Sequence, residues 1–104
     1  MYATVRRYEG IEKDRVDEVT KKVGESLMPR MSKLPGFGGY FLIEAGEGVM
    51  TSINLFETSD QAHESTRVAA TWIREENLET VLRNTPKITA GEVVAHETNG
   101  AFKA

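Results

Sequence analysis

The sequence contains no cysteine, which excludes disulfide scaffolds, thiolate zinc sites and cysteine nucleophiles. Its two histidines, His63 and His96, lie far apart and have no paired carboxylate spacing, so no metal site is predicted. No apolar run reaches the ~18 residues that would predict a membrane span, and the N-terminus lacks the apolar stretch of a signal peptide. We therefore expect a cytoplasmic protein that binds neither a metal nor a membrane.

Basic residues are not in excess either. The chain has 13 Lys and Arg against 16 Asp and Glu, a formal net charge of −3. A mildly acidic protein lacks the positive surface that attracts polyanions. Nucleic acid is therefore not predicted as a partner.

The composition that remains is that of one small domain. The chain has 104 residues, of which 39% are hydrophobic, enough for a single modest core but not for two domains. We expect this domain to span residues 1–97, followed by a loose polar tail over residues 98–104.

Hydrophobic periodicity and turn residues predict the secondary structure. Apolar residues three and four positions apart predict a helix between the first two strands, with a kink or a break at Pro29. Thr58 and Gln61 have the spacing of a capping box at the start of a second helix, which either continues or restarts through Leu82. The four strands are predicted at residues 2–8, 39–45, 49–56 and 88–95.

This order of elements, βαββαβ, predicts an α+β ferredoxin-like fold: an antiparallel sheet with both helices on one face. The central hairpin is apolar on both faces, with Phe41 and Ile43 on one side and Leu42 on the other. Two helices can cover only one face, and an antiparallel sheet with a wet face should show a polar side. A second copy of the chain is the simplest cover, so we expect a homodimer through the sheet face, with light scattering as the test.

Two segments resemble a known family. Pro35-Gly36-Phe37-Gly38-Gly39-Tyr40 opens the second strand, and Phe56-Glu57-Thr58-Ser59-Asp60-Gln61-Ala62 joins the third strand to the second helix. Both are similar to the dimeric α/β-barrel superfamily, most of all to its antibiotic-biosynthesis-monooxygenase-like domains. The resemblance covers most of the chain and implies a dimeric α/β barrel with a cavity between each sheet and its helices. Members include cofactor-free oxygenases of quinol and anthrone-like substrates, and haem-degrading monooxygenases.

The haem-degrading branch is a poor fit. That branch places an Asn on the first strand, where this chain has Arg6 and Arg7. It also places a Trp and a haem-ligating His on the second helix, at the positions of Thr66 and Glu75 here. Haem is therefore judged unsuitable as a cofactor, and no other cofactor is expected. The cofactor-free branch uses a Trp, an Asn and an Arg or Tyr around a flat aromatic substrate.

Five residues are candidates for a site. Trp72, Asn54, Arg7 and Tyr40 are the candidate substrate-binding residues, and His96 is the candidate catalytic base, with its reference pKa near ~6.5. Each also has a structural interpretation: a core tryptophan, a cross-strand hydrogen bond, an exposed ion pair, strand packing or a satisfied histidine. Consecutive strand residues point to opposite faces, so Arg6 and Arg7 cannot both face the interior.

Two functions are consistent with these residues. One is a cofactor-free monooxygenase-like protein that binds a small, flat, apolar or aromatic metabolite between sheet and helices. The alternative is a non-catalytic dimeric module of the same fold, for ligand binding or a stress response. A void large enough for a bicyclic ligand favours the first, and a fully packed interior favours the second.

Overall fold

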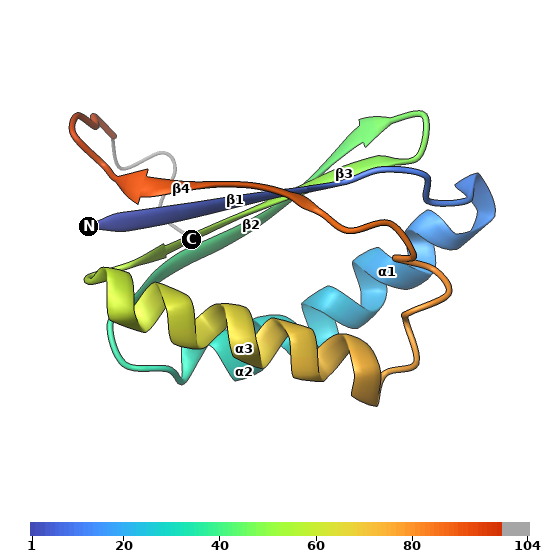
Figure 1. The fold of residues 1–104 in the computed structure, drawn as a ribbon, viewed down its shortest axis with the longest axis horizontal. Coiled ribbons are helices and arrows are strands. Elements are labelled where there is room, and N and C mark those ends of the chain that lie inside the picture. The colour runs from blue at the N-terminus through green and yellow to red at the C-terminus, as the bar shows by residue number, and fades with distance from the viewer. Residues whose placement is uncertain (99–104) are drawn as a thin grey trace.

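A four-stranded antiparallel sheet organises the computed structural model, which describes residues 1–98 (Figure 1). Its strands lie in the order β2-β3-β1-β4. They are β1 (Tyr2–Tyr8), β2 (Phe37–Gly46), β3 (Val49–Phe56) and β4 (Lys87–Glu92). β1 and β3 form the centre and pair antiparallel, with Arg6 opposite Ser52 and Thr4 opposite Asn54.

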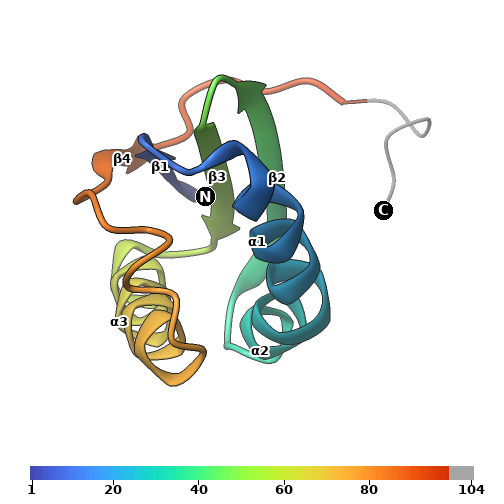
Figure 2. The same ribbon diagram turned by 90° about the vertical axis from the view of Figure 1, so that its right-hand side faces the viewer.

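All the helices cover one face of this sheet (Figures 1 and 2). The first helical segment consists of η1 (Lys13–Arg15), α1 (Val16–Lys22), η2 (Val23–Leu27) and α2 (Met28–Ser32). The second is α3 (Ser59–Glu75), which lies beside the first in Figure 2. This arrangement confirms the predicted ferredoxin-like α+β fold. None of the helices within residues 1–98 has the length and apolar character needed to cross a membrane.

Pro29 distorts the first helical segment without breaking it. Proline has no backbone N–H, so the carbonyl four residues earlier loses its usual helical partner. The chain accommodates this with η2, a π-helical turn directly before α2, in which the Met28 N–H donates to the Val23 carbonyl. π-helical turns are rare in proteins and commonly occur at functional sites. This one contains Ser26, which contacts the candidate site.

The two segments that carried the family resemblance meet in space. Gly36 has a φ of +77°, and a Cβ at this position would lie 1.9 Å from the side-chain Oε1 of Gln61. Gln61 in turn completes the capping box of α3, because its backbone N–H donates to the Thr58 hydroxyl and its amide accepts from the Thr58 N–H. Only glycine fits against this cap. The predicted capping box is therefore confirmed.

Two predicted boundaries are wrong. The last strand ends at Glu92 rather than residue 95, because Glu92 already pairs with Tyr2, the first residue of β1. Helix α3 ends at Glu75 and does not continue through Leu82; the left-handed backbone of Asn77, with φ of 57°, follows it directly. Of the predicted tail, residues 99–104 lie outside the described residues.

The β2–β3 hairpin carries apolar side chains on the outer face of the sheet, as predicted. Phe41 and Ile43 are about half exposed there, at 51% and 45%. Val5 and Ile53 pair on this face and are half-buried. The opposite face packs against the helices around a core that includes Met50, Phe56, Trp72 and Leu78, each no more than 1% exposed. Both faces of the sheet are thus suited to burial, while the helices cover only one.

Candidate functional site

A stripe of buried polar side chains crosses the helix-facing side of the sheet. Thr4 and Arg6 of β1 and Ser52 and Asn54 of β3 are each less than 5% exposed. They share this face because residues two apart in a strand point the same way, and the register pairs them directly. A core of this size normally buries such groups only with hydrogen-bond partners. The stripe is therefore the part of the interior whose side chains can bind a ligand or take part in a reaction.

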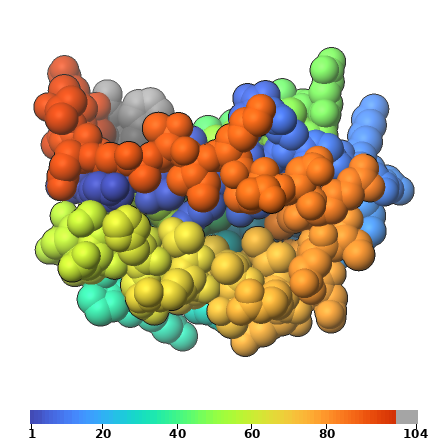
Figure 3. Space-filling view, viewed as in Figure 1, coloured from blue at the N-terminus to red at the C-terminus, as the bar shows by residue number. Residues whose placement is uncertain are grey.

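Two adjoining cavities lie beside this stripe. An inner cavity of about 30 Å³ is walled by Tyr40, Ser52 and Trp72, among others. An outer cavity of about 240 Å³ opens between α3, β4 and the segment that links them, where Figure 3 shows the surface hollowed. Both cavities are lined by the same five residues at their junction: Arg6, Tyr8, Ala69, Ile73 and Leu82.

Arg6 is the charged group at this junction. Arg6 is 3% exposed, and its guanidinium donates a hydrogen bond to the Thr66 hydroxyl on α3. Among the described residues, no carboxylate lies within 4.0 Å of it to form an ion pair. A buried cation that has only a neutral partner is costly.

Two tyrosine hydroxyls lie near this charge. Burial raises the pKa of Tyr8 above its ordinary value of 10.0, and the Arg6 charge offsets part of that rise. Burial likewise raises the pKa of Tyr40, partly offset by the Ser52 hydroxyl and by Arg6. Both phenols are therefore protonated at neutral pH and can donate hydrogen bonds into the cavity.

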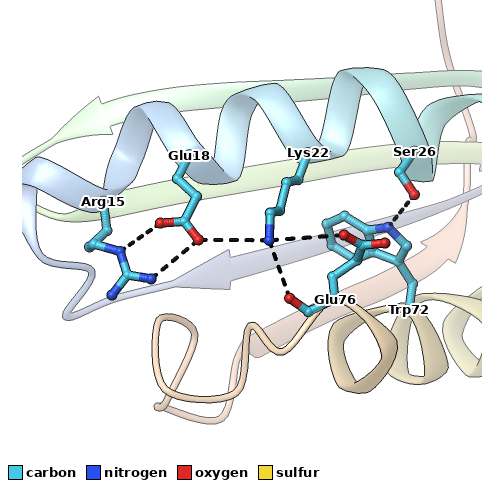
Figure 4. A network of polar contacts seen from close by, with 6 residues as sticks. All are labelled: Arg15, Glu18, Lys22, Ser26, Trp72 and Glu76. Carbon is cyan, nitrogen blue, oxygen red and sulfur yellow. Dashed lines mark hydrogen bonds and ion pairs between the residues drawn. The ribbon is translucent and has the colours of Figure 1, made fainter.

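Trp72 forms a wall of the inner cavity but has no free donor. The side chain is 1% exposed, and its Nε1–H donates to Ser26 Oγ at 2.9 Å (Figure 4). Beside it, Lys22 of α1 links the two helical segments through the carbonyl of Glu76 at 3.3 Å and the Glu76 carboxylate at 3.9 Å. Trp72 can thus offer a ligand its ring but not its N–H.

Asn54 belongs to the same stripe but does not line either cavity. Its Nδ2 donates to Ser65 Oγ at 3.3 Å, and that hydroxyl donates to the Ala62 carbonyl at 2.6 Å. Its Oδ1 has no hydrogen-bond partner although the residue is fully buried. Asn54 therefore holds β3 against α3.

The structure places two other candidates away from the cavities. Arg7 lies on the outer face of the sheet and pairs with Glu9 at 2.7 Å, because the register turns Arg6 inward instead. His96 follows β4 and is exposed, away from both cavities. Sequence reasoning thus missed Arg6, Tyr8 and Thr66 as lining residues. The alternation of Thr4, Arg6 and Tyr8 on one face was the available signal.

The two histidines lie outside the cavities. His63 is exposed at the start of α3, with its ring 6.1 Å from that of Tyr2, and His96 is exposed as well. Neither histidine lines a cavity, so neither can supply an axial ligand there. Within residues 1–98, no three His, Asp or Glu side chains gather as a metal site.

No protein-family model and no curated protein matches the sequence. Solved structures do match the fold. The NE2512 protein of unknown function from Nitrosomonas europaea has a TM-score of 0.75 at 18% identity, over 95% of this chain and 94% of that one. The monooxygenase ActVA-Orf6 of Streptomyces coelicolor, in complex with nanaomycin D, has a TM-score of 0.73 at 11% identity, over 95% and 92%.

A third structure, an antibiotic biosynthesis monooxygenase, has a TM-score of 0.70 at 12% identity, over 91% of this chain and all of that one. At these identities the likeness establishes the fold alone. The shared fold confirms the resemblance to the antibiotic-biosynthesis-monooxygenase-like domains.

Proposed function

We propose that the two adjoining cavities bind a small, flat, largely apolar metabolite and that the chain oxygenates it without a cofactor. The observation that carries this proposal is a space between the sheet and α3 that opens at the surface and combines apolar walls with hydroxyl groups, among them those of Tyr8, Tyr40 and Ser52. The volume of about 240 Å³ lies below the ~300–1,000 Å³ usual for drug-sized ligands, which favours two or three fused rings.

The proposed reaction needs few catalytic groups from the protein, because the substrate itself reduces O₂. An anthrone-like substrate loses a proton to form a carbanion, which itself donates electrons to O₂. The ring CH₂ becomes C=O, with one oxygen atom retained in the product and the other leaving as water. The apolar walls would exclude bulk water, and the protonated phenols of Tyr8 and Tyr40 would hydrogen-bond the substrate's oxygens.

Oxygen uptake tests this proposal directly. Purified protein is offered anthrones and naphthoquinols in an oxygen electrode, with the uncatalysed rate subtracted. Ala70→Phe is the blocking variant, because Ala70 is exposed and lines only the outer cavity. We expect uptake by the wild type, its loss in Ala70→Phe, and unchanged melting temperatures. Equal rates for the two proteins would show that the reaction does not use this cavity.

The second candidate is a non-catalytic binding module. It is favoured by one observation: within the described residues, neither cavity is lined by a histidine or a carboxylate that could act as a general base. Thermal stabilisation by the same compounds without oxygen uptake would support this function over the first.

We also propose that the apolar outer face of the sheet pairs with that of a second copy. Phe41 and Ile43 are the exposed side chains that such a contact would bury. Light scattering should show a dimer that Phe41→Glu converts to a monomer, while Lys21→Glu on α1, which is exposed, leaves it intact. A monomeric wild type at micromolar concentration would contradict the pairing.

A further inference from the structure

Arg6 has a position that folding alone does not explain. It is a fixed positive charge, 3% exposed, whose one hydrogen-bond partner in the described structure is the neutral Thr66 hydroxyl. Buried charges in proteins are normally paired, because desolvation of an isolated ion costs several kcal/mol even after relaxation. An arginine cannot escape this cost by losing its proton.

The missing partner cannot come from the opposite face of the sheet. Arg6 shares the helix-facing side with Thr4 and Ser52, so a chain packed on Phe41 and Ile43 would lie on the other side of the sheet. The space that Arg6 does reach is the junction of the two cavities, which it lines in both. The cavities are therefore the space from which a counterion for this charge can approach.

The outer cavity has the electrostatic character of an anion site. Its lining includes two arginines and no aspartate or glutamate. Arg83 is exposed and pairs with the Glu12 carboxylate at 3.7 Å, whereas Arg6 has no carboxylate within 4.0 Å among the described residues. This contrasts with the chain as a whole, whose net charge is −3. Clefts lined by one sign of charge concentrate ligands of the opposite sign.

We propose that the ligand of this cavity is an anion: an apolar ring compound whose ionised oxygen group, a carboxylate or a phenolate, binds the Arg6 guanidinium beside Thr66. The rings would occupy the outer cavity toward Ala70 and Ile88, and the charged group would lie against Arg6. The guanidinium presents a planar fork of donors that suits two oxygens at once. This inference rests on the proposed small-molecule function of the cavity and adds the charge of its ligand.

A matched pair of ligands tests the charge requirement. 2-Naphthoate and 2-naphthylmethanol have similar shapes but differ in charge at neutral pH, and 2-naphthol at high pH supplies the phenolate. Calorimetry should show naphthoate binding at least ~30-fold more tightly than the alcohol, the change expected for a buried charged contact. Trp72, the one tryptophan of the chain, lines the inner cavity and gives a second readout through its fluorescence.

Neighbouring arginines supply the variant and its control. Arg6→Gln should remove the preference for naphthoate and leave the affinity for the alcohol within about threefold. Arg7→Gln should change neither affinity, because Arg7 lies on the other face of the sheet. Arg6→Lys keeps the charge without the fork and should weaken naphthoate about tenfold, which keeps the test valid if Arg6→Gln folds poorly.

The outcomes separate the two proposals. If both compounds bind the wild type equally, the anion inference fails while the cavity remains a binding site. If naphthoate keeps its preference in Arg6→Gln, the inference also fails, because another group then recognises the charge. If none of the three compounds binds, both the anion inference and the proposed function are overturned.

Discussion

Replacing Arg6 by methionine should stabilise the protein in the absence of any ligand. Methionine retains the apolar stem and much of the volume of the arginine but removes the buried charge. The one hydrogen bond that is lost goes to the Thr66 hydroxyl, which keeps its own bond to the Ala62 carbonyl at 3.3 Å. The substitution therefore leaves no buried polar group without a partner.

The magnitude follows from two opposing terms. Replacing buried ionic groups by apolar ones of similar volume stabilises proteins by up to about 4 kcal/mol. Loss of a charge-assisted hydrogen bond costs about 1.5–3 kcal/mol. We expect a net gain of about 1–2 kcal/mol, which corresponds to a rise in melting temperature of roughly 5–15 °C for a domain of this size.

Urea unfolding followed by circular dichroism measures the effect. The midpoint should rise while the slope m stays constant, since the surface exposed on unfolding hardly changes. Arg7→Met is the control and should stay within about 0.5 kcal/mol of the wild type, because Arg7 is exposed. A loss of 1 kcal/mol or more in Arg6→Met would refute the reasoning: Arg6 would then be a structural residue whose charge is satisfied within the protein.

Three further predictions concern the surroundings of the cavity. Ser26→Ala and Trp72→Phe should couple by about 1 kcal/mol in a double-mutant cycle of urea unfolding, since each removes the same 2.9 Å hydrogen bond; additive effects would show that the bond contributes nothing. Thr58→Ala should lower the free energy of unfolding by about 1 kcal/mol through loss of the α3 cap, whereas Thr58→Ser should retain it. Burial raises the pKa of Tyr8 and of Tyr40 by disfavouring the ionised phenols, so the fold should keep its full stability below pH 10.0 and lose stability as the pH rises above it. Tyr8→Phe and Tyr40→Phe should reduce this loss in alkaline melting curves, and an unchanged curve would contradict the burial of the two phenols.

The fold could be predicted because local signals agreed with one another. The capping box at Thr58 and Gln61 and the glycine at position 36 were recognised as separate motifs, and in the structure they form one joint. The position of Pro29 also predicted a distortion of the first helix, although its form as a π-helical turn depends on packing. Consistency of this kind between local and global structure is what makes a fold readable from its sequence.

The end of the last strand could not be predicted because it depends on a partner. Residues after Glu92 still include Val93 and Val94, which favour strands. A strand ends, however, where its neighbour ends, and the register of β1 against β4 brings Glu92 opposite Tyr2. Val93 makes one more backbone hydrogen bond, to the Met1 carbonyl at 2.8 Å. The candidate His96 lies beyond the end of β4, so pairing within the sheet does not hold it in place.

Which of Arg6 and Arg7 faces the core could not be predicted either, because it also depends on how β1 pairs with its neighbours. The hydrophobic pattern of β1 favours turning Ala3, Val5 and Arg7 toward the core, because that face of the strand carries two apolar residues. The structure has the opposite face inward, so that Thr4 and Arg6 are buried while Val5 lies on the half-exposed outer face. Stability alone would not select this arrangement, because it buries a charge and leaves apolar surface uncovered. Violations of a local rule concentrate where function requires them. Here one register produces two such violations, a buried charge inside the domain and exposed apolar side chains outside it.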